Sequence, residues 1–339
     1  MFQTIRMTTA AAVAGIALSG PALAQTEMNF ALDWRFEGPA APYFAAVDNG
    51  HFAEEGLEVE ISPGQGSLDA IPKVATGAFP VGFADMASLV KFLDQNPGAP
   101  VTGVMMMYDR PAFAVIGRVS RGIETPEDLE GSVLGAPPPD GAWAQFPAFA
   151  AANDLDMDSI TVESVGFPTR APMLAEGEVD AITGFSFTSF LNVARLGVPE
   201  EDISTILMAE HGLELYGNVI IVNTDFAAEN PEAVTGFLRA VARGLQDVVD
   251  DPEAGIESLV ARNPALDNEL ELRRLNLALR DNILTDWVLE NGLGNIDPAR
   301  LERSLDQIAM GYEFQRDPDP ALYFTDAYLP TDGSLMISR

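Results

Sequence analysis

Aromatic side chains stand directly after several segments with the pattern of β-strands. Trp34 ends the first such segment, and Phe167 and Phe185 follow two others, at 160–165 and 179–183. Ligand crevices in α/β proteins open at strand ends, and an aromatic face there can stack on a flat heterocycle or pack against an apolar group. Each ring could instead belong to a core, so the recurrence after successive strands is the better indication of a binding site.

Charged and polar side chains accompany these rings. Arg35 could hold an acidic group by paired N–H bonds, and Glu37 could accept the protons of an amine. Asp85 follows the strand-like segment 81–84, where its carboxylate could accept ring or amino N–H groups or cap the next helix. The further candidate ligand contacts are Gln65 and Ser67 in a glycine-rich turn before a helix, Trp143 after a proline-rich loop, Ser186 beside Phe185, and Tyr216 and Asn218 in the segment 212–222.

Trp143 has a specific predicted partner. It stands where the stiff loop 137–141 leads into a helix. If that helix begins at the crevice, Trp143 faces Trp34 and the two rings clamp a planar ligand. The other interpretation is core packing, as for the remaining aromatic residues.

Residue types for covalent or metal chemistry are scarce. The chain has no cysteine and two histidines, His51 and His211, which excludes thiolate sites and leaves too few ligands for a histidine zinc site. Neither a Gly-x-Ser-x-Gly elbow nor a Gly-x-x-x-x-Gly-Lys loop occurs. We expect a binding protein without cofactor or metal rather than an enzyme, although the many carboxylates leave a glycoside-hydrolase pair open.

The elements that would position these residues alternate regularly. Strands are predicted at 28–34, 57–62, 81–84, 101–107, 132–135, 160–165, 179–183 and 215–222, and helices at 40–53, 68–75, 86–93, 143–153, 173–176, 234–248 and 301–312. Thr125 to Asp128 has the pattern of a helix start. This alternation predicts the α/β class, with mostly parallel sheets covered by helices.

The order of the elements predicts two lobes. The first lobe would comprise 25–115 and a return over 215–339 that includes the C-terminal helices, and the second lobe would comprise 116–214. The two crossings lie near 110–118 and 212–222, and a ligand would bind between the lobes.

The N-terminus has the pattern of a cleavable secretory signal. Arg6 precedes an apolar run at 10–18, and small residues end at Ala24 before Gln25. We predict cleavage after Ala24 and a periplasmic location; a membrane anchor is the alternative, but the run is short for a bilayer. The net charge of −32 argues against nucleic acid as a partner, because that binding requires a basic surface.

Two stretches, Leu-Asp-Trp-Arg-Phe-Glu-Gly-Pro at 32–39 and Ala-Ala-Val-Asp-Asn-Gly-His-Phe-Ala-Glu-Glu-Gly-Leu-Glu-Val at 45–59, are more specific. They resemble the periplasmic substrate-binding proteins of ABC importers for thiamine pyrimidine, riboflavin, taurine, sulfonate and nitrate. Those proteins commonly carry a strand ending in Asp-Trp and then Ala-x-x-x-Gly-Phe/Tyr-Phe-x-x-Glu-Gly-Leu-x-Val. Segments 74–85, 123–131, 174–181 and 230–234 agree in the same order.

This resemblance implies the type II periplasmic-binding-protein fold. It also implies a monomer that closes around a small molecule and delivers it to a membrane permease and its ATPase. Relatives that bind the pyrimidine often have a histidine soon after the tryptophan. Here residues 38–42 are Gly-Pro-Ala-Ala-Pro, which puts a pyrimidine in doubt.

The ligand class stays open at this level. A planar nitrogen heterocycle, such as a thiamine-precursor pyrimidine, fits Glu37, Asp85 and the tryptophans. An aromatic carboxylate, a sulfonate such as taurine, or a nitrate-like anion would need Arg35, Arg110 or Arg170. A ligand sensor for a receptor is the alternative from another class. A thiamine-pyrimidine synthase is the least favoured, because those enzymes are intracellular and carry a cysteine-rich motif.

Overall fold

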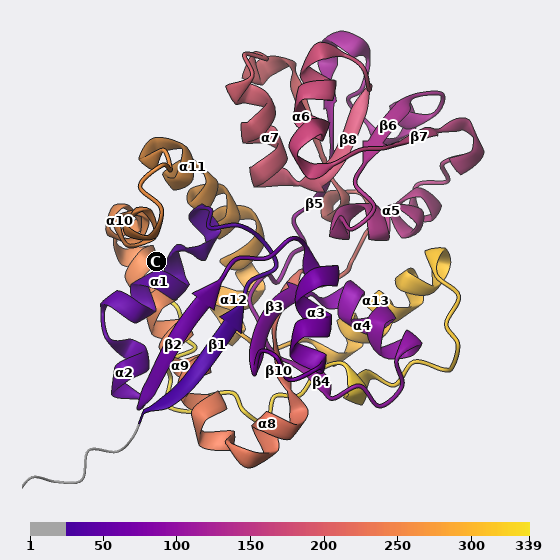
Figure 1. Cartoon of the computed structure of the whole chain (residues 1–339). Coiled ribbons are helices and arrows are strands. Elements are labelled where there is room, and N and C mark those ends of the chain that lie inside the picture. Colours follow the sequence, from indigo (N-terminus) through magenta and orange to yellow (C-terminus); the bar gives the residue numbers. More distant parts are fainter. Residues whose placement is uncertain (1–24) are drawn as a thin grey trace, which may run out of the picture.

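Two lobes, each built on one sheet, make up the molecule (Figure 1). The structure is a computed structural model, and it describes residues 25–339. The predicted signal peptide, 1–24, lies outside the described residues. Within 25–339, no helix combines the length and the apolar character that crossing a membrane requires.

The first sheet has five strands, and one of them runs against the others. The strand order is β2 (Leu57–Ser62), β1 (Thr26–Ala31), β3 (Val81–Asp85), β10 (Asn218–Asn223) and β4 (Val101–Met106). β1 is parallel to β2 and β3, whereas β10 is antiparallel to β3 and β4. β10 begins at the end of the sheet where β3 finishes, because the chain returns there from the second lobe, so it has to run the opposite way.

The second sheet repeats this arrangement. Its order is β7 (Thr161–Ser164), β6 (Val133–Ala136), β8 (Ala181–Phe185), β5 (Phe113–Arg118) and β9 (Ile203–Leu207). β5, the strand that enters from the first lobe, is antiparallel to β8 and β9. The carboxyl ends of the parallel strands in both sheets therefore face the junction between the lobes, which is where the sequence places most of its candidate site residues.

Helices cover both sheets (Figure 1). Those of the first lobe are α1 (Ala41–Asp48), α2 (His51–Glu54), α3 (Ser67–Ala75), α4 (Met86–Gln95), α8 (Thr224–Glu229), α9 (Pro231–Asp250), α10 (Pro252–Arg262), α11 (Asn268–Ala278), α12 (Asp286–Asn291) and α13 (Pro298–Gly311). Those of the second lobe are α5 (Gly141–Ala152), α6 (Phe167–Glu176) and α7 (Ser186–Arg195).

Three predicted helices differ from those observed. The helix expected over 40–53 is divided into a 3-10 turn, α1 and α2, because Gly50 takes a left-handed backbone conformation with φ of 79° between the two helices. The helix start at Thr125 opens only a 3-10 turn, Pro126–Leu129. The helix expected at 173–176 begins earlier, so that Phe167 is the first residue of α6.

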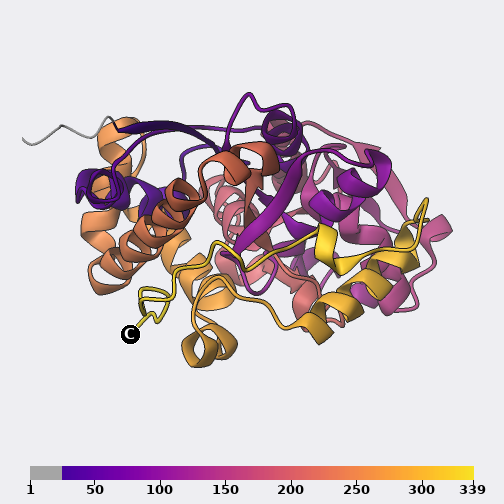
Figure 2. The ribbon, with the colours of Figure 1, turned by 90° about the horizontal axis from the view of Figure 1, so that it is seen from below.

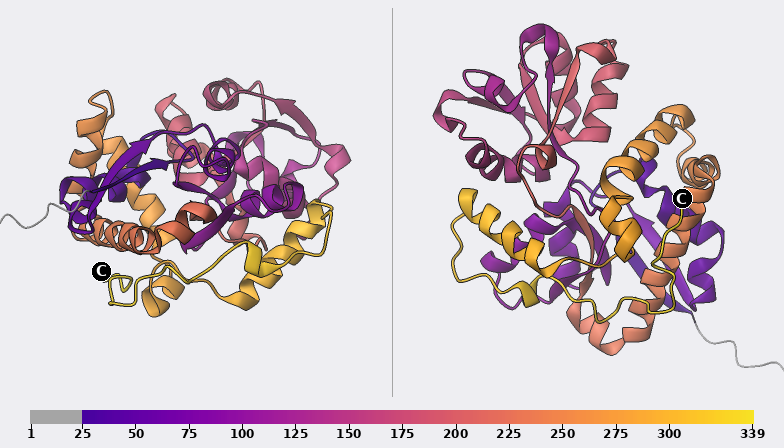
Figure 3. Two further views of the ribbon diagram at one scale, coloured as in Figure 1. Left: turned by 60° about the horizontal axis from the view of Figure 1, so that its bottom comes forward. Right: turned by 180° about the vertical axis from the view of Figure 1, so that it is seen from behind.

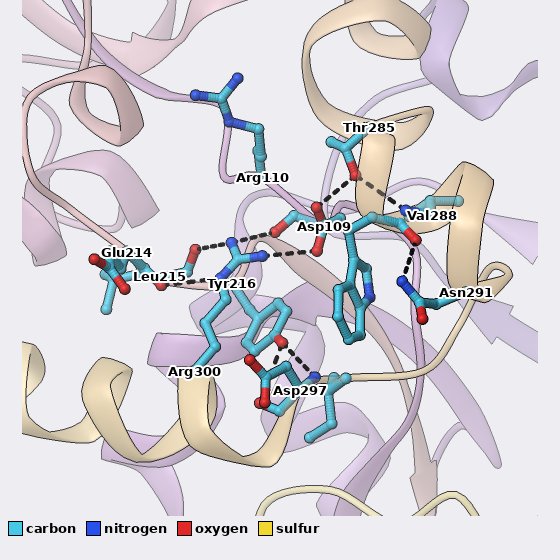
Figure 4. A network of polar contacts seen from close by, with 12 residues as sticks. Asp109, Arg110, Glu214, Leu215, Tyr216, Thr285, Val288, Asn291, Asp297 and Arg300 are labelled. Carbon is cyan, nitrogen blue, oxygen red and sulfur yellow. Dashed lines mark hydrogen bonds and ion pairs between the residues drawn. The ribbon is translucent and has the colours of Figure 1, made fainter.

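Two chain segments, 107–112 and 208–217, connect the sheets, and one arginine of α13 joins them (Figure 4). The Arg300 guanidinium donates to the Asp109 carboxylate at 2.7 Å, to the Asp109 carbonyl at 2.7 Å and to the Leu215 carbonyl at 2.9 Å. It also lies 4.1 Å from the ring centre of Tyr216. Thr285 donates to the other Asp109 oxygen at 2.6 Å. These contacts fix both crossings against the first lobe.

Helices of the two lobes also touch beside the crossings. Lys91 of α4 donates from Nζ to the Ala144 carbonyl of α5 at 2.6 Å and to Gln145 Oε1 at 3.0 Å. α13 packs on the same α5, and on the other flank α11 packs on α7. After α13 the chain runs back along the first lobe (Figures 2 and 3) and lies beside β4, where Phe324 pairs with Gly103.

Candidate ligand-binding cleft

A cleft between the lobes holds about 670 Å³ of space unfilled by atoms, including the part that is open to solvent. Its lining comes from both lobes. The first lobe contributes Leu32, Asp33, Trp34, Arg35, Glu37, Pro39, Ala40, Tyr43, Gly66, Ser67, Phe83 and Tyr108, and the second lobe contributes Pro139, Asp140, Gly141, Phe167, Arg170, Phe185, Phe187 and Thr188.

Aromatic rings form much of this lining. Trp34 and Phe167 meet edge to face across the lobes, with ring centres 4.7 Å apart at 74°. Phe83 contacts Tyr108, which in turn contacts Phe187. Trp34 Nε1 is buried and has no hydrogen-bond partner among residues 25–339. A buried donor without a partner is costly.

A carboxyl group without a cation partner lies among the rings. Asp33 is 7 % exposed, and its Oδ2 accepts from Asn218 Nδ2 at 2.7 Å and from Ser67 Oγ at 3.5 Å. Burial raises the pKa of Asp33 to about 7, and the nearby Asp85 adds to the rise, while the Asn218 hydrogen bond opposes it. Near neutral pH this carboxyl can therefore bind or release a proton inside the cleft.

The second lobe contributes a buried arginine whose donors are already engaged. Arg170 Nη1 donates to the Thr183 carbonyl at 3.0 Å and lies 3.4 Å from Asp140 Oδ2, which also accepts from Thr183 Oγ1 at 2.8 Å. The guanidinium carbon is 5.1 Å from the ring centre of Phe167. Burial lowers the pKa of Arg170, and Asp140 opposes this effect. Arg170 therefore positions α6 and β8 as well as facing the cleft.

Glu37 connects the two lobes at the cleft wall. Its Oε2 accepts from Thr188 Oγ1 of α7 at 2.8 Å and lies 3.5 Å from Arg274 Nε of α11. Arg274 is itself buried, with bonds to Glu271 Oε1 at 2.6 Å and to Asn192 Oδ1 at 2.8 Å. Together with the Trp34–Phe167 contact, these bonds hold the lobes in a closed arrangement.

Six of the predicted site residues line this cleft: Trp34, Arg35, Glu37, Ser67, Phe167 and Phe185. They come from the segment after β1, the start of α3, the start of α6 and the end of β8. The expectation that strand ends bring these side chains together is met in this geometry. Whether they contact a ligand remains a prediction.

The other six lie outside the lining. Trp143 stacks on Phe146 of its own helix, with centres 5.6 Å apart, and therefore does not face Trp34, whose partner is Phe167. Asp85 is fully buried and caps α4 by accepting from Ser88 N at 2.8 Å. Gln65 is exposed, and the Ser186 N–H donates to the Ala112 carbonyl. Tyr216 lies in the second crossing, where its hydroxyl accepts from the Asp297 N–H, and Asn218 donates to the Asp33 carboxyl.

Several lining residues are absent from the sequence-based set of candidates. Tyr43, Phe83 and Tyr108 lie in apolar segments that are indistinguishable from core in the sequence. Asp33 had a usable signal, because an acidic residue directly after the buried end of a strand needs a reason to be there. Of the three arginines considered for an anion, Arg35 and Arg170 reach the lining and Arg110 does not. The two histidines also lie outside the lining; His51 pairs with Asp247.

Sequence comparison identifies relatives over most of the chain. The riboflavin-binding protein RibY of Chloroflexus aurantiacus is 28 % identical over 298 residues, covering 86 % of this chain and 82 % of RibY. The formylaminopyrimidine-binding protein of Halalkalibacterium halodurans is 25 % identical, covering 73 % and 75 %. A 4-amino-5-hydroxymethyl-2-methylpyrimidine phosphate synthase of Aspergillus parasiticus is 25 % identical, covering 79 % and 82 %.

The fold has close structural counterparts. The periplasmic aliphatic sulphonate binding protein SsuA of Escherichia coli superposes with a TM-score of 0.70 at 12 % identity, covering 89 % of this chain and 99 % of SsuA. That likeness confirms the predicted two-lobed α/β fold of the periplasmic binding proteins. The NMT1/THI5-like family matches residues 39–255, a span that contributes to both sheets and to both walls of the cleft. The resemblance seen in the sequence is thereby confirmed, and the chain belongs to the NMT1/THI5-like family.

Proposed function

We propose that this protein is the extracytoplasmic solute-binding component of an ABC importer. It captures a small planar molecule between its lobes and delivers it, as a monomer, to a membrane permease and its ATPase. The observation that carries the proposal is the cleft itself: aromatic rings of both lobes meet at a cleft lined by both lobes, which also holds the Asp33 carboxyl without a cation partner.

The geometry supports capture rather than conversion. The cleft lining contains no histidine, the side chain most often used as a general base. Its arginine on the second lobe is already engaged by Asp140 and Thr183. Ligand binding would favour the closed arrangement, because contacts from both lobes exist together only there. The names of two relatives, a riboflavin-binding and a formylaminopyrimidine-binding protein, support the same role.

Within this role we favour a planar nitrogen heterocycle over an anion. The lining holds three carboxyl groups, Asp33, Glu37 and Asp140, against two guanidinium groups, and Arg170 already faces Asp140. An anion would depend on Arg35, which is exposed and lies 5.6 Å over Trp34. A sulfonate or an aromatic carboxylate held at Arg35 is the second candidate.

Calorimetric titration of the purified protein, after removal of any co-purified ligand, tests the proposal. The compounds are riboflavin, 4-amino-5-hydroxymethyl-2-methylpyrimidine, benzoate, taurine, an alkanesulfonate and nitrate. We expect one heterocycle to bind one to one and to raise the melting temperature, since binding at 100 times Kd stabilises by about 2.7 kcal/mol. Recovery of the compound unchanged after incubation would support transport over catalysis. Product formation, or binding of none of these classes, would contradict the proposal.

A further inference from the structure

The start of α4 meets the start of α5 across the lobes. Asp85 is the last residue of β3 and caps α4, where its Oδ1 accepts from the Ser88 N–H at 2.8 Å. Its other oxygen, Oδ2, lies 3.0 Å from the place that a Cβ on Gly141, the first residue of α5, would occupy. Glycine lets the two helix starts come this close, because any other residue would press a Cβ against a fully buried carboxyl.

This carboxyl faces a helix end that lacks a cap of its own. The first N–H groups of a helix carry partial positive charge, and no side chain caps those of α5 within the described part of the chain. Asp140, which precedes α5, instead accepts from Thr183 Oγ1 at 2.8 Å. Burial raises the pKa of Asp85, whereas the Ser88 hydrogen bonds and then the Lys91 ammonium oppose the rise. A charged Asp85 is therefore stabilised from both lobes.

Lys91, further along α4, makes the second contact. Its Nζ donates to the Ala144 carbonyl of α5 at 2.6 Å and to Gln145 Oε1 at 3.0 Å. The turn of α5 that receives this ammonium leads into Pro147. A proline inside a helix has no N–H to donate to the preceding turn and bends the helix there. The carbonyls of this turn are therefore open to a donor from outside the helix.

The surroundings of Lys91 enclose its bond to α5. The ammonium lies 5.6 Å from the ring centre of Tyr312, which follows α13. Tyr312 donates to Asp94 Oδ2 at 2.8 Å, and Arg316 Nε lies 3.5 Å from the other Asp94 oxygen. Gln145, on the α5 side, is fully buried. A hydrogen bond from a charged donor is stronger in such an enclosed place than at the surface.

We propose that the start of α4 latches onto the start of α5 and holds the lobes closed when no ligand is bound. The latch consists of two contacts, Lys91 with Ala144 and Asp85 with Gly141. Neither side chain of α4 lines the cleft, so the latch acts without touching the ligand. The inference deepens the proposed function: a ligand enters only while the latch is open, and its own contacts then add to those that favour closure.

Spin labels on the two lobes measure closure without any ligand. The chain has no cysteine, so Glu58→Cys on β2 and Glu163→Cys on β7 provide unique labelling sites. Both residues are exposed, and they lie on the edge strands of different sheets. Double electron–electron resonance on the ligand-free protein should give a single distance, that of the closed arrangement.

The two lysines of the chain supply a matched pair of variants. Lys91→Met keeps the apolar stem and removes the ammonium. It should add a population at longer distance and raise the ratio of open to closed protein by about tenfold or more, as the loss of a charged hydrogen bond implies. Lys73→Met removes the other lysine, whose partner Asp69 belongs to the same helix, and should leave the distances unchanged.

Gly141→Ala tests the second contact. Alanine favours a helix more than glycine does, and its Cβ meets Asp85 only when α5 lies against α4. This variant should therefore open the protein while α5 remains folded, and it decides the matter if Lys91→Met does not fold. A ligand-free wild type that is already open, unchanged distances in Lys91→Met, or equal opening in Lys73→Met would overturn the inference. These measurements contain no ligand, so their failure leaves the proposed capture function standing.

Discussion

Replacing Asp33 by Asn should stabilise the empty protein, and the gain should depend on pH. The carboxyl has a folded-state pKa of about 7 against an ordinary value of 3.8, a rise of about three units. At about 1.36 kcal/mol per unit, the charged form costs the folded state up to about 4 kcal/mol. Folding raises the pKa of this carboxyl. Its contribution to the free energy of unfolding is therefore fully present below about pH 4 and is lost as the pH rises to about 7.

Urea denaturation followed by tryptophan fluorescence measures this effect. The free energies of unfolding of the wild type and of Asp33→Asn should agree near pH 4 and diverge up to pH 8, with the variant the more stable. Comparing the two proteins at each pH cancels the shared contribution of the other carboxylates. A variant less stable than the wild type at pH 8, or a difference that does not change with pH, would refute the reasoning.

Asp202 provides a control of opposite sign. Its pKa is lowered to about 2, first by the Ser120 N–H and then by the Arg118 side chain. A lowered pKa contributes stability that is present above the unfolded value and is lost as the pH falls through about 2. Asp202→Asn should therefore destabilise the protein at neutral pH, and this loss should shrink towards pH 2.

Three further substitutions examine the cleft and the crossings. Trp34→Ala removes the ring that meets Phe167 and should weaken ligand binding by about tenfold or more in calorimetry; unchanged affinity would remove Trp34 from the site. Thr188→Val deletes the hydroxyl that reaches Glu37 from the other lobe and should weaken binding about fivefold, about 1 kcal/mol, with a melting temperature close to the wild type. Arg300→Gln leaves the crossings without their shared donor and should lower the free energy of unfolding by about 2–3 kcal/mol. Arg303→Gln, one turn along α13 on an exposed pair, should change it by less than about 1 kcal/mol. Equal effects of the two arginine substitutions would contradict the role given to Arg300.

The sequence predicts helices and strands well where the buried apolar residues recur at the regular spacing of a helix or a strand. Residues 57–62 alternate apolar and polar side chains and form β2 with those bounds. The apolar face at 234–248 lies within α9, which packs on α1. Trp34 follows β1 of the first sheet and Phe185 ends β8 of the second sheet. Both reach one cleft because the carboxyl ends of the parallel strands in both sheets face the junction between the lobes.

The rest of the site depends on the rotation of helices and on contacts between lobes, which have no local signal. Trp143 is close to the cleft in sequence, yet the helical phase of α5 turns it onto Phe146. Arg170 reaches back from α6 to the Thr183 carbonyl, and only the fold reveals that partner. Tyr43 and Tyr108 lie in segments that are apolar throughout, where a ring lining the cleft and a ring in the core look alike.

The bond from Lys91 to α5 has a practical consequence for following the motion of the lobes. The chain contains two lysines, Lys73 and Lys91. Lys73 is about one-third exposed, whereas Lys91 is held against the Ala144 carbonyl across the lobes, and burial lowers its pKa to about 8. Once α5 swings away, Lys91 becomes accessible and its pKa returns towards the ordinary lysine value, because the burial that lowers it is lost. Acylation of Lys91 relative to Lys73, read by peptide mass spectrometry, would then report the open fraction of the unmodified protein without any introduced label.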